Sequence, residues 1–90
     1  MSIQKQQTQT FSIAQTRELE MKKALKEVYA ALAEKAALTG KEYNPVDQIV
    51  GYIVSEDPTY ITNYKNARGI IRKIDIYELL NELVRNYLEI

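Results

Sequence analysis

Two proline-containing segments divide this chain into separate helices and set where they begin and end. Asn44 precedes Pro45, and Asp57 precedes Pro58. Asn is a favoured N-cap, Pro is well tolerated at the first helical position, and Asp47 complements the positive end of a helix. A residue that precedes Pro is disfavoured in helical geometry. The sequence therefore predicts a helix that begins at Pro45 and ends before Asp57.

The first helix is expected over residues 16–38. Thr16 is a suitable N-cap, and Gly40 can close the helix because glycine readily takes the left-handed conformation. Apolar residues recur here at the spacing of one helical face, whereas three lysines fall outside that face. The expected buried stripe is Met21, Leu25, Val28 and Leu32, and the lysines are Lys22, Lys23 and Lys26.

Two further helices are expected after Pro58. One covers residues 62–73, and the other begins at Asp75, where Glu78 follows in a variant of the capping box. Gly51 interrupts the second helix, which a close helix crossing there would explain. The expected apolar faces are Val46, Ile49, Val50 and Ile53 in the second helix, Tyr64, Ala67, Ile70, Ile71 and Ile74 in the third, and Leu79, Leu80, Leu83, Val84, Tyr87 and Leu88 in the last.

The expected fold class is all-α, a small bundle of about four helices. Residues 1–15 are expected to form a flexible polar tail, because they are rich in Gln, Thr and Ser and have too little apolar surface to offset the entropy of ordering. Weak alternation at 11–13 leaves a short strand or a docked extended segment open. Residues 16–90 form the helical domain. Its thin core and the wide apolar face of its last helix predict a homodimer.

Composition argues against several classes of function. The chain has no His and no Cys, which removes the usual zinc sites and activated nucleophiles. Lys plus Arg and Asp plus Glu are both 12, so no overall field favours a polyanion. The polar start and the lack of a long apolar run indicate neither a signal peptide nor a membrane span. We therefore expect a soluble cytoplasmic protein that is not an enzyme and has no cofactor; Asp47, Asp75 and Glu78 are interpreted as helix caps.

The third helix offers a candidate binding site. Four of its basic residues have no acid among them, and this set, which we call the basic ridge, is Lys65, Arg68, Arg72 and Lys73. The ridge could bind a phosphate on a nucleic acid or on a modified threonine, so a nucleic-acid-associated module is an alternative function. The interpretation we favour is a solvated face that pairs with Glu78 or Glu82. The nearby Tyr52, Tyr60 and Tyr64 could stack on bases, although buried tyrosines are commoner.

Several segments carry a more specific signal. They are residues 28–32 with 34–35, the Tyr-Asn-Pro-Val-Asp-Gln-Ile-Val-Gly-Tyr segment at 43–52, residues 55–61 with Asp-Pro-Thr-Tyr, Asn-Ala-Arg at 66–68, Ile-Arg-Lys at 71–73, and residues 82–85 with 87–88. Together they resemble the IreB family of small bacterial regulatory phosphoproteins. The resemblance implies an all-helical homodimer that is phosphorylated by a membrane Ser/Thr kinase, with a cognate phosphatase as a second partner. The pathway implied is envelope stress and antibiotic tolerance in Gram-positive bacteria.

The resemblance also implies where the phosphate is added. In that family the modified threonine lies in the N-terminal tail shortly before an aromatic residue. Thr8 stands three residues before Phe11 and matches this position, and Thr10 is a second acceptor beside it. The tail lacks the acidic residues often found in relatives, and Lys5 stands where some have another acceptor. Extra residues at 36–42 predict a longer first helix and an altered dimer edge. A phosphate on the tail is expected to dock on the ridge residues Arg68, Arg72 or Lys73.

Overall fold

The computed structural model describes residues 13–90, and that range is helical without strands. The elements are α2 (Ile13–Thr39), α3 (Pro45–Ser55), the 3-10 turns η1 (Pro58–Tyr60) and η2 (Tyr64–Asn66), α4 (Ala67–Arg72) and α5 (Ile76–Leu88). The all-α fold class is confirmed. Most of the expected tail lies outside the described residues, so its flexibility stays a prediction.

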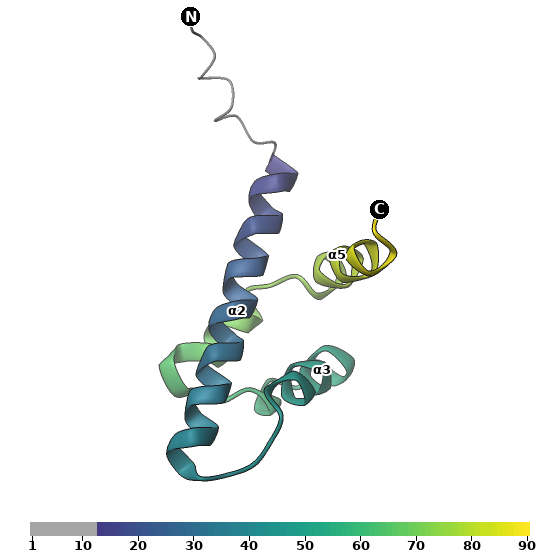
Figure 1. Ribbon diagram of the computed structural model, residues 1–90. Helices are drawn as coiled ribbons and strands as arrows, with labels where there is room; N and C mark the ends of the chain where they lie inside the picture. The colour runs from purple at the N-terminus through teal and green to yellow at the C-terminus, as the bar shows by residue number, and fades with distance from the viewer. Residues whose placement is uncertain (1–12) are drawn as a thin grey trace, which may run out of the picture.

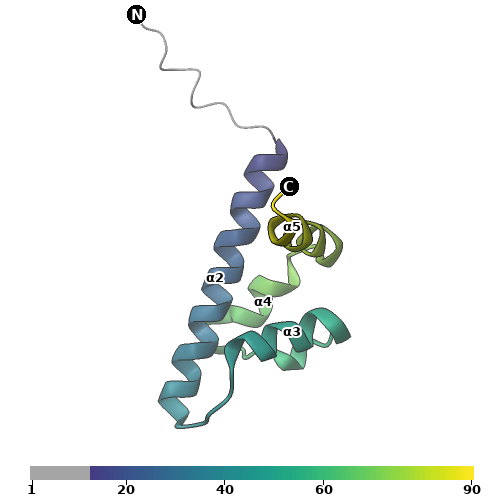
Figure 2. The ribbon, with the colours of Figure 1, turned by 45° about the vertical axis from the view of Figure 1, so that its right-hand side comes forward.

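The long helix α2 organises the molecule, and the other helices lie to one side of it (Figure 1). The short helix α4 packs along α2, which also contacts α3 and η2. Both α3 and α5 project from the same side of α2 like two arms, and α4 lies between them along the chain and in space (Figure 2). The arm α5 has few backbone contacts with any other helix.

The hydrophobic core lies where α2 meets α4 and the turns that precede it. Val28 and Leu32 of α2 are almost completely buried, and they pack with Ile61, Ala67 and Ile71, which have no exposed surface. Met21 and Leu25 are partly buried against this cluster, so the expected stripe of the first helix is confirmed. No polar or charged side chain is buried within residues 13–90.

The caps expected at Asn44, Asp75 and Gly40 are present. The Asn44 side chain accepts a hydrogen bond from the Val46 N–H at 2.8 Å, and Asp75 accepts one from the Glu78 N–H at 3.0 Å. Gly40 follows α2 with a φ of +70°, in the left-handed conformation expected of it. These contacts satisfy backbone groups that a helix end leaves without partners.

Two expected boundaries are wrong. α2 begins at Ile13, three residues before the expected start, and Thr16 lies inside the helix. Nothing at Ala14 or Gln15 opposes a helix, so a cap-forming residue further along did not set the start. The third helix is divided into η2 and α4, because Lys65 and Asn66 both have positive φ angles, of 51° and 60°. Asn tolerates the left-handed conformation and is a weak local sign of the break, whereas Lys65 gives none.

Gly51 is needed for a contact with a ring and not for a helix crossing. A Cβ atom at this position would overlap the Cε1 and Cδ1 atoms of Tyr60, which follows α3 in the turn η1. The expected close approach is therefore real, but its partner is a side chain from the adjoining turn. This contact folds η1 back onto α3, and the side chain of Gln48 donates a hydrogen bond to the Tyr60 carbonyl at 3.0 Å in the same place.

Candidate functional site

An apolar groove lies between α2 and the two arms. Its volume is about 680 Å³, and it is open to solvent. The floor comes from α2, one wall from α3 and the other from α5. The apolar residues that line it are Leu19, Met21, Leu25 and Tyr29 of α2, Val46, Ile49, Val50 and Ile53 of α3, and Leu79 and Leu83 of α5.

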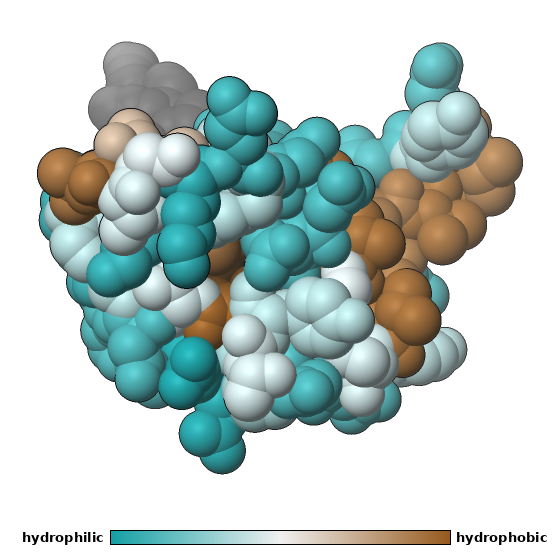
Figure 3. Space-filling view, turned by 90° about the horizontal axis from the view of Figure 1, so that it is seen from below, coloured by the Kyte–Doolittle hydropathy of each residue, from teal (hydrophilic) through white to brown (hydrophobic). Residues whose placement is uncertain are grey.

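The expected buried stripe of α3 is only partly buried, because some of its residues line the groove. Val46 and Val50 are 53% and 49% exposed, and Ile53 is only half-buried, whereas Ile49 and Tyr52 are in the core. The spacing correctly places one apolar face on this helix, but part of that face lines the groove instead of contacting another helix of the chain. Figure 3 shows hydrophobic atoms at the end of the molecule where the arms project. Part of the apolar face of α3 is therefore open to solvent.

A second unpartnered apolar surface lies on α5. Leu79 is its one buried residue, and Leu83 faces the groove. On another side of the helix, four further residues are 42% to 90% exposed, and this set, which we call the outer strip, is Leu80, Val84, Tyr87 and Leu88. The expected wide apolar face of the last helix is therefore confirmed, and the described chain covers only a small part of it.

Charges border the groove on both sides. Lys22 and Lys26 line it from α2, and Glu18 and Glu82 line it where α2 approaches α5. Burial raises the pKa of the Glu82 carboxyl above its ordinary value, and the Glu18 carboxyl beside it raises it further through a hydrogen bond and repulsion. An occupant of the groove would therefore meet two lysines along α2 and an acidic pair where α2 and α5 approach each other.

The expected basic ridge is not one surface. Lys65 forms an ion pair with Glu34 at 2.8 Å, which raises the pKa of Lys65, and Arg68 donates from Nε to the Ile61 carbonyl at 2.9 Å. Both side chains thus hold the turns around η2 in place. Arg72 and Lys73 are exposed and form no ion pair with a described residue. Two of the four residues therefore remain available to bind an anion.

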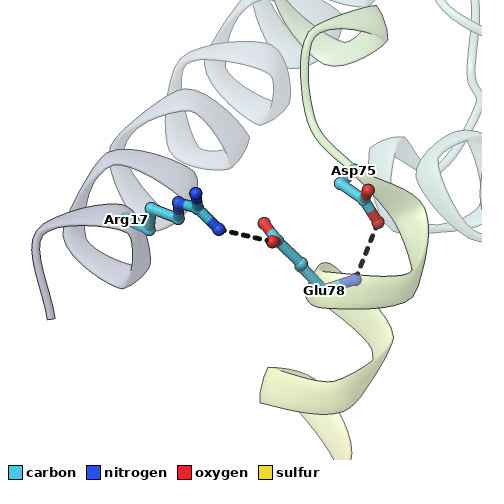
Figure 4. A network of polar contacts seen from close by, with 3 residues as sticks. All are labelled: Arg17, Asp75 and Glu78. Atoms are coloured by element: carbon cyan, nitrogen blue, oxygen red, sulfur yellow. Dashed lines mark hydrogen bonds and ion pairs between the residues drawn. The ribbon is translucent and has the colours of Figure 1, made fainter. Parts of the chain in front are cut away.

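The acids expected to pair with the ridge have other neighbours. Glu78 forms an ion pair with Arg17 of α2 at 2.8 Å, and Asp75 caps α5 beside it (Figure 4). The Glu78 carboxylate thus reaches across to α2, and Glu82 lies beside Glu18. The pairing of the ridge with Glu78 or Glu82 is wrong. Its cause is the position of α5, which faces the start of α2 and not α4.

The remaining candidate residues have different outcomes. Tyr52 is buried, Tyr60 packs on Gly51, and the Tyr64 ring lies 5.6 and 5.7 Å from the ammonium groups of Lys35 and Lys65. Tyr60 and Tyr64 therefore already have structural contacts. The tail hydroxyls, including Thr8 and Thr10, lie outside the described residues, so their modification stays a prediction.

The groove was not predicted from the sequence, because periodicity reveals an apolar face but not what covers it.

Comparison with known proteins agrees with the fold and the motifs. The chain matches the family described as IreB regulatory phosphoprotein over residues 6–89. A UPF0297 protein of Ruminiclostridium cellulolyticum is 49% identical over 83 residues, covering 92% of this chain and 88% of that protein. A UPF0297 protein of Lachnoclostridium phytofermentans is 48% identical over 82 residues, covering 91% and 86%. The chain belongs to the IreB family of regulatory phosphoproteins.

Proposed function

We propose that this protein is a non-enzymatic, cytoplasmic regulator that a membrane Ser/Thr kinase phosphorylates at Thr8 or Thr10. The pathway would be the envelope-stress and antibiotic-tolerance signalling implied by the family resemblance, with a cognate phosphatase reversing the modification. Membership of a family described as regulatory phosphoproteins carries this proposal, and the matched range of 6–89 includes both threonines.

The chemistry of the described residues supports a role without catalysis. No group of three or more Asp and Glu residues within 13–90 could hold a metal ion, and no polar side chain there is buried. Catalytic acids and bases usually depend on burial or on close charged neighbours that shift their pKa values. None of the helices in this range combines the length and the apolar character of a membrane span. The surface is instead suited to binding another macromolecule.

Phosphorylation can be tested directly. The purified chain would be incubated with the kinase domain from the same organism, and phosphosites would be mapped by mass spectrometry. We expect modification at Thr8 or Thr10 and its loss in Thr8→Val with Thr10→Val. Ser2 and Ser12 stay in place in this variant as a control for non-specific modification of the tail. Absence of any modified tail residue would reject the proposed function.

We also propose that the protein acts as a homodimer, in which the apolar groove and the outer strip of α5 provide the interface. Two apolar surfaces on one chain suit a symmetric dimer, because the strip of each copy can enter the groove of the other and bury both at once. The lysines and the acidic pair, at different positions along the groove, would orient the entering helix.

Light scattering during size-exclusion chromatography tests the dimer. Val50→Glu in the groove and Val84→Glu in the outer strip should each weaken association about tenfold or more, because both place an unpaired charge in an apolar interface. Val54→Glu, at a position of α3 that is 81% exposed and does not line the groove, is the matched control. A monomer at high concentration would reject the dimer, whereas a dimer unaffected by either change would reject this interface.

A nucleic-acid-associated module remains the alternative from another class. Arg72, Lys73 and the lysines of α2 could contact phosphates, but Lys65 is paired and Arg68 is bound to a backbone carbonyl. A salt-dependent shift with duplex or junction DNA would favour this function. A flat titration at low salt would exclude it.

A further inference from the structure

The exposed side of α2 carries a compact basic surface beside the groove. Two adjacent lysines and a third one turn later form it, and this set, which we call the lysine cluster, is Lys22, Lys23 and Lys26. They surround Leu19, which is 53% exposed, in a shallow hollow that Ala30 also lines. The cluster therefore presents cations around a small apolar centre.

The lysine cluster is not neutralised by the described part of the chain. The ion pairs between residues 13 and 90 are Arg17–Glu78 and Lys65–Glu34, and neither includes a cluster lysine. Glu27 is the one acid that lines the hollow with them. Glu18 and Glu82 approach Lys22 and Lys26 from the groove and do not line the hollow. Within the hollow, three cations against one acid leave a local excess of positive charge, which favours an anion with an apolar group attached.

The N-terminal segment of this chain has the matching chemistry once it is phosphorylated. Residues 8–11 read Thr-Gln-Thr-Phe, so two acceptor hydroxyls lie within three residues of an aromatic ring. Residues 1–12 contain no acid, and Lys5 makes them positively charged. The unmodified segment would thus be repelled by the lysines, whereas each phosphate adds about 1.5 to 2 negative charges.

The segment is long enough to reach the cluster. Thr8 is five residues before Ile13, where α2 begins, and five extended residues span up to about 17 Å. Lys22 and Lys26 lie about 14 and 20 Å along the helix from Ile13, at a rise of 1.5 Å per residue, and their long side chains shorten the gap. If the chain turned back at the start of α2, Phe11 would lie near Leu19 and Thr8 near the lysines.

We propose that the lysine cluster is a phosphothreonine-binding site for the chain's own N-terminal segment, with the phosphate of Thr8 on the lysines and the Phe11 ring against Leu19. This inference rests on the proposed phosphorylation and names the surface that responds to it. Because Lys22 and Lys26 also line the groove, the docked phosphate places its charge on the groove rim. Phosphorylation thereby changes the charge of the surface proposed to bind a second copy.

The cluster is a better receptor for this phosphate than the basic ridge. Lys65 and Arg68 of the ridge already have partners, which leaves only Arg72 and Lys73 on it. Lys73 also lies beside Glu20, Asp75 and Glu78, which line the same hollow and repel a phosphate. The two surfaces make different predictions, so one experiment separates them.

The test places phosphothreonine at position 8 of the full chain during translation and follows its titration by phosphorus NMR. A phosphate held by lysines gives up its second proton more easily, so we expect it to be about threefold more acidic than in a free peptide of residues 1–12. The gain should disappear in K22Q/K23Q/K26Q and in 1 M salt, and persist in R72Q/K73Q. Glutamine keeps the helix propensity close to that of lysine, and circular dichroism would check the fold.

Two results would overturn the inference. One is a phosphate that titrates in the full chain as it does in the peptide. The other is a gain in acidity that survives K22Q/K23Q/K26Q, including the case in which R72Q/K73Q alone removes it. Leu19→Ala should reduce the gain, and no effect of this change would remove the Phe11 contact from the proposal. Because translation installs the phosphate, failure of the kinase to modify Thr8 would reject the proposed function without affecting this result.

Discussion

The helices α4 and α5 follow each other in the chain but contribute very differently to the fold. α4 has only 6 residues, yet Ala67 and Ile71 are completely buried between it and α2. α5 has 13 residues with a wide apolar face, and Leu79 alone is buried. Local capping and periodicity are as good in α5 as anywhere in the chain. Capping and periodicity therefore specify that a segment forms a helix. How closely that helix packs against α2 decides how much it stabilises the domain.

The contrast between α4 and α5 can be tested by truncating one apolar side chain in each helix, and the largest effect is expected in α4. Ile71→Ala should cost about 2–5 kcal/mol of unfolding free energy, because it leaves a cavity in a close-packed core. Val84→Ala, at a site 54% exposed, should change the stability of the monomer by no more than about 0.5 kcal/mol. Chemical denaturation at several protein concentrations would separate folding from association. Similar losses in both variants at low concentration would show that α5 belongs to the core.

A second prediction concerns the place where α3 joins the body. Gly51→Ala should cost about 1–3 kcal/mol, because the new methyl group overlaps the Tyr60 ring and the turn η1 must move. Much of that cost should disappear when Tyr60→Ala is added, since the ring is then absent. A double-mutant cycle from thermal or chemical unfolding measures this coupling. Additive losses would mean that the ring does not limit the position of α3.

A smaller effect is expected from the contacts that hold the start of α5. Asp75→Ala removes the N-cap and should cost about 1 kcal/mol. Glu78→Gln removes the ion pair with Arg17. The Arg17 side chain is 61% exposed and that of Glu78 is 40% exposed, so the loss of this pair should cost less than about 1 kcal/mol. Hydrogen exchange of the α5 amides measures both changes. A larger effect of Glu78→Gln would mean that the ion pair, rather than the cap, positions this arm.

The sequence predicts the elements of this fold better than it predicts their contacts. The side chains of Asn44 and Asp75 each accept a hydrogen bond from a backbone N–H two or three residues later, so both caps could be predicted from the local sequence. Val46 and Val50 illustrate the limit, because an apolar face has the same spacing whether it meets a core or an open groove. The break at Lys65 and Asn66 has only a weak local signal in Asn66, because Lys65 adopts a positive φ while its side chain pairs with Glu34 of α2.

The candidate site was predictable only in part. The wide apolar face of α5 was visible, but its separation into a groove wall and an outer strip depends on how that helix lies against α2. The spacing of the basic ridge could be read from the sequence, but the partners of its residues could not. Glu34 pairs with Lys65 and the Ile61 carbonyl accepts from Arg68, so only part of the ridge is left without a partner among the described residues. The lysines of α2 were placed on a solvent face, and the structure adds their position at the rim of the groove.

The smallest expected effect tests the acidic pair between α2 and α5. The folded chain raises the pKa of Glu82, so it holds that proton more tightly than the unfolded chain does. Stability is therefore lost as the pH rises through the raised value. Glu82→Gln should raise the melting temperature at pH 7 and make little difference at pH values below the ordinary 4.5. Glu18→Gln should act in the same direction, because it removes the neighbouring charge, and a lower melting temperature in both variants at pH 7 would show that the pair instead stabilises the contact between α2 and α5.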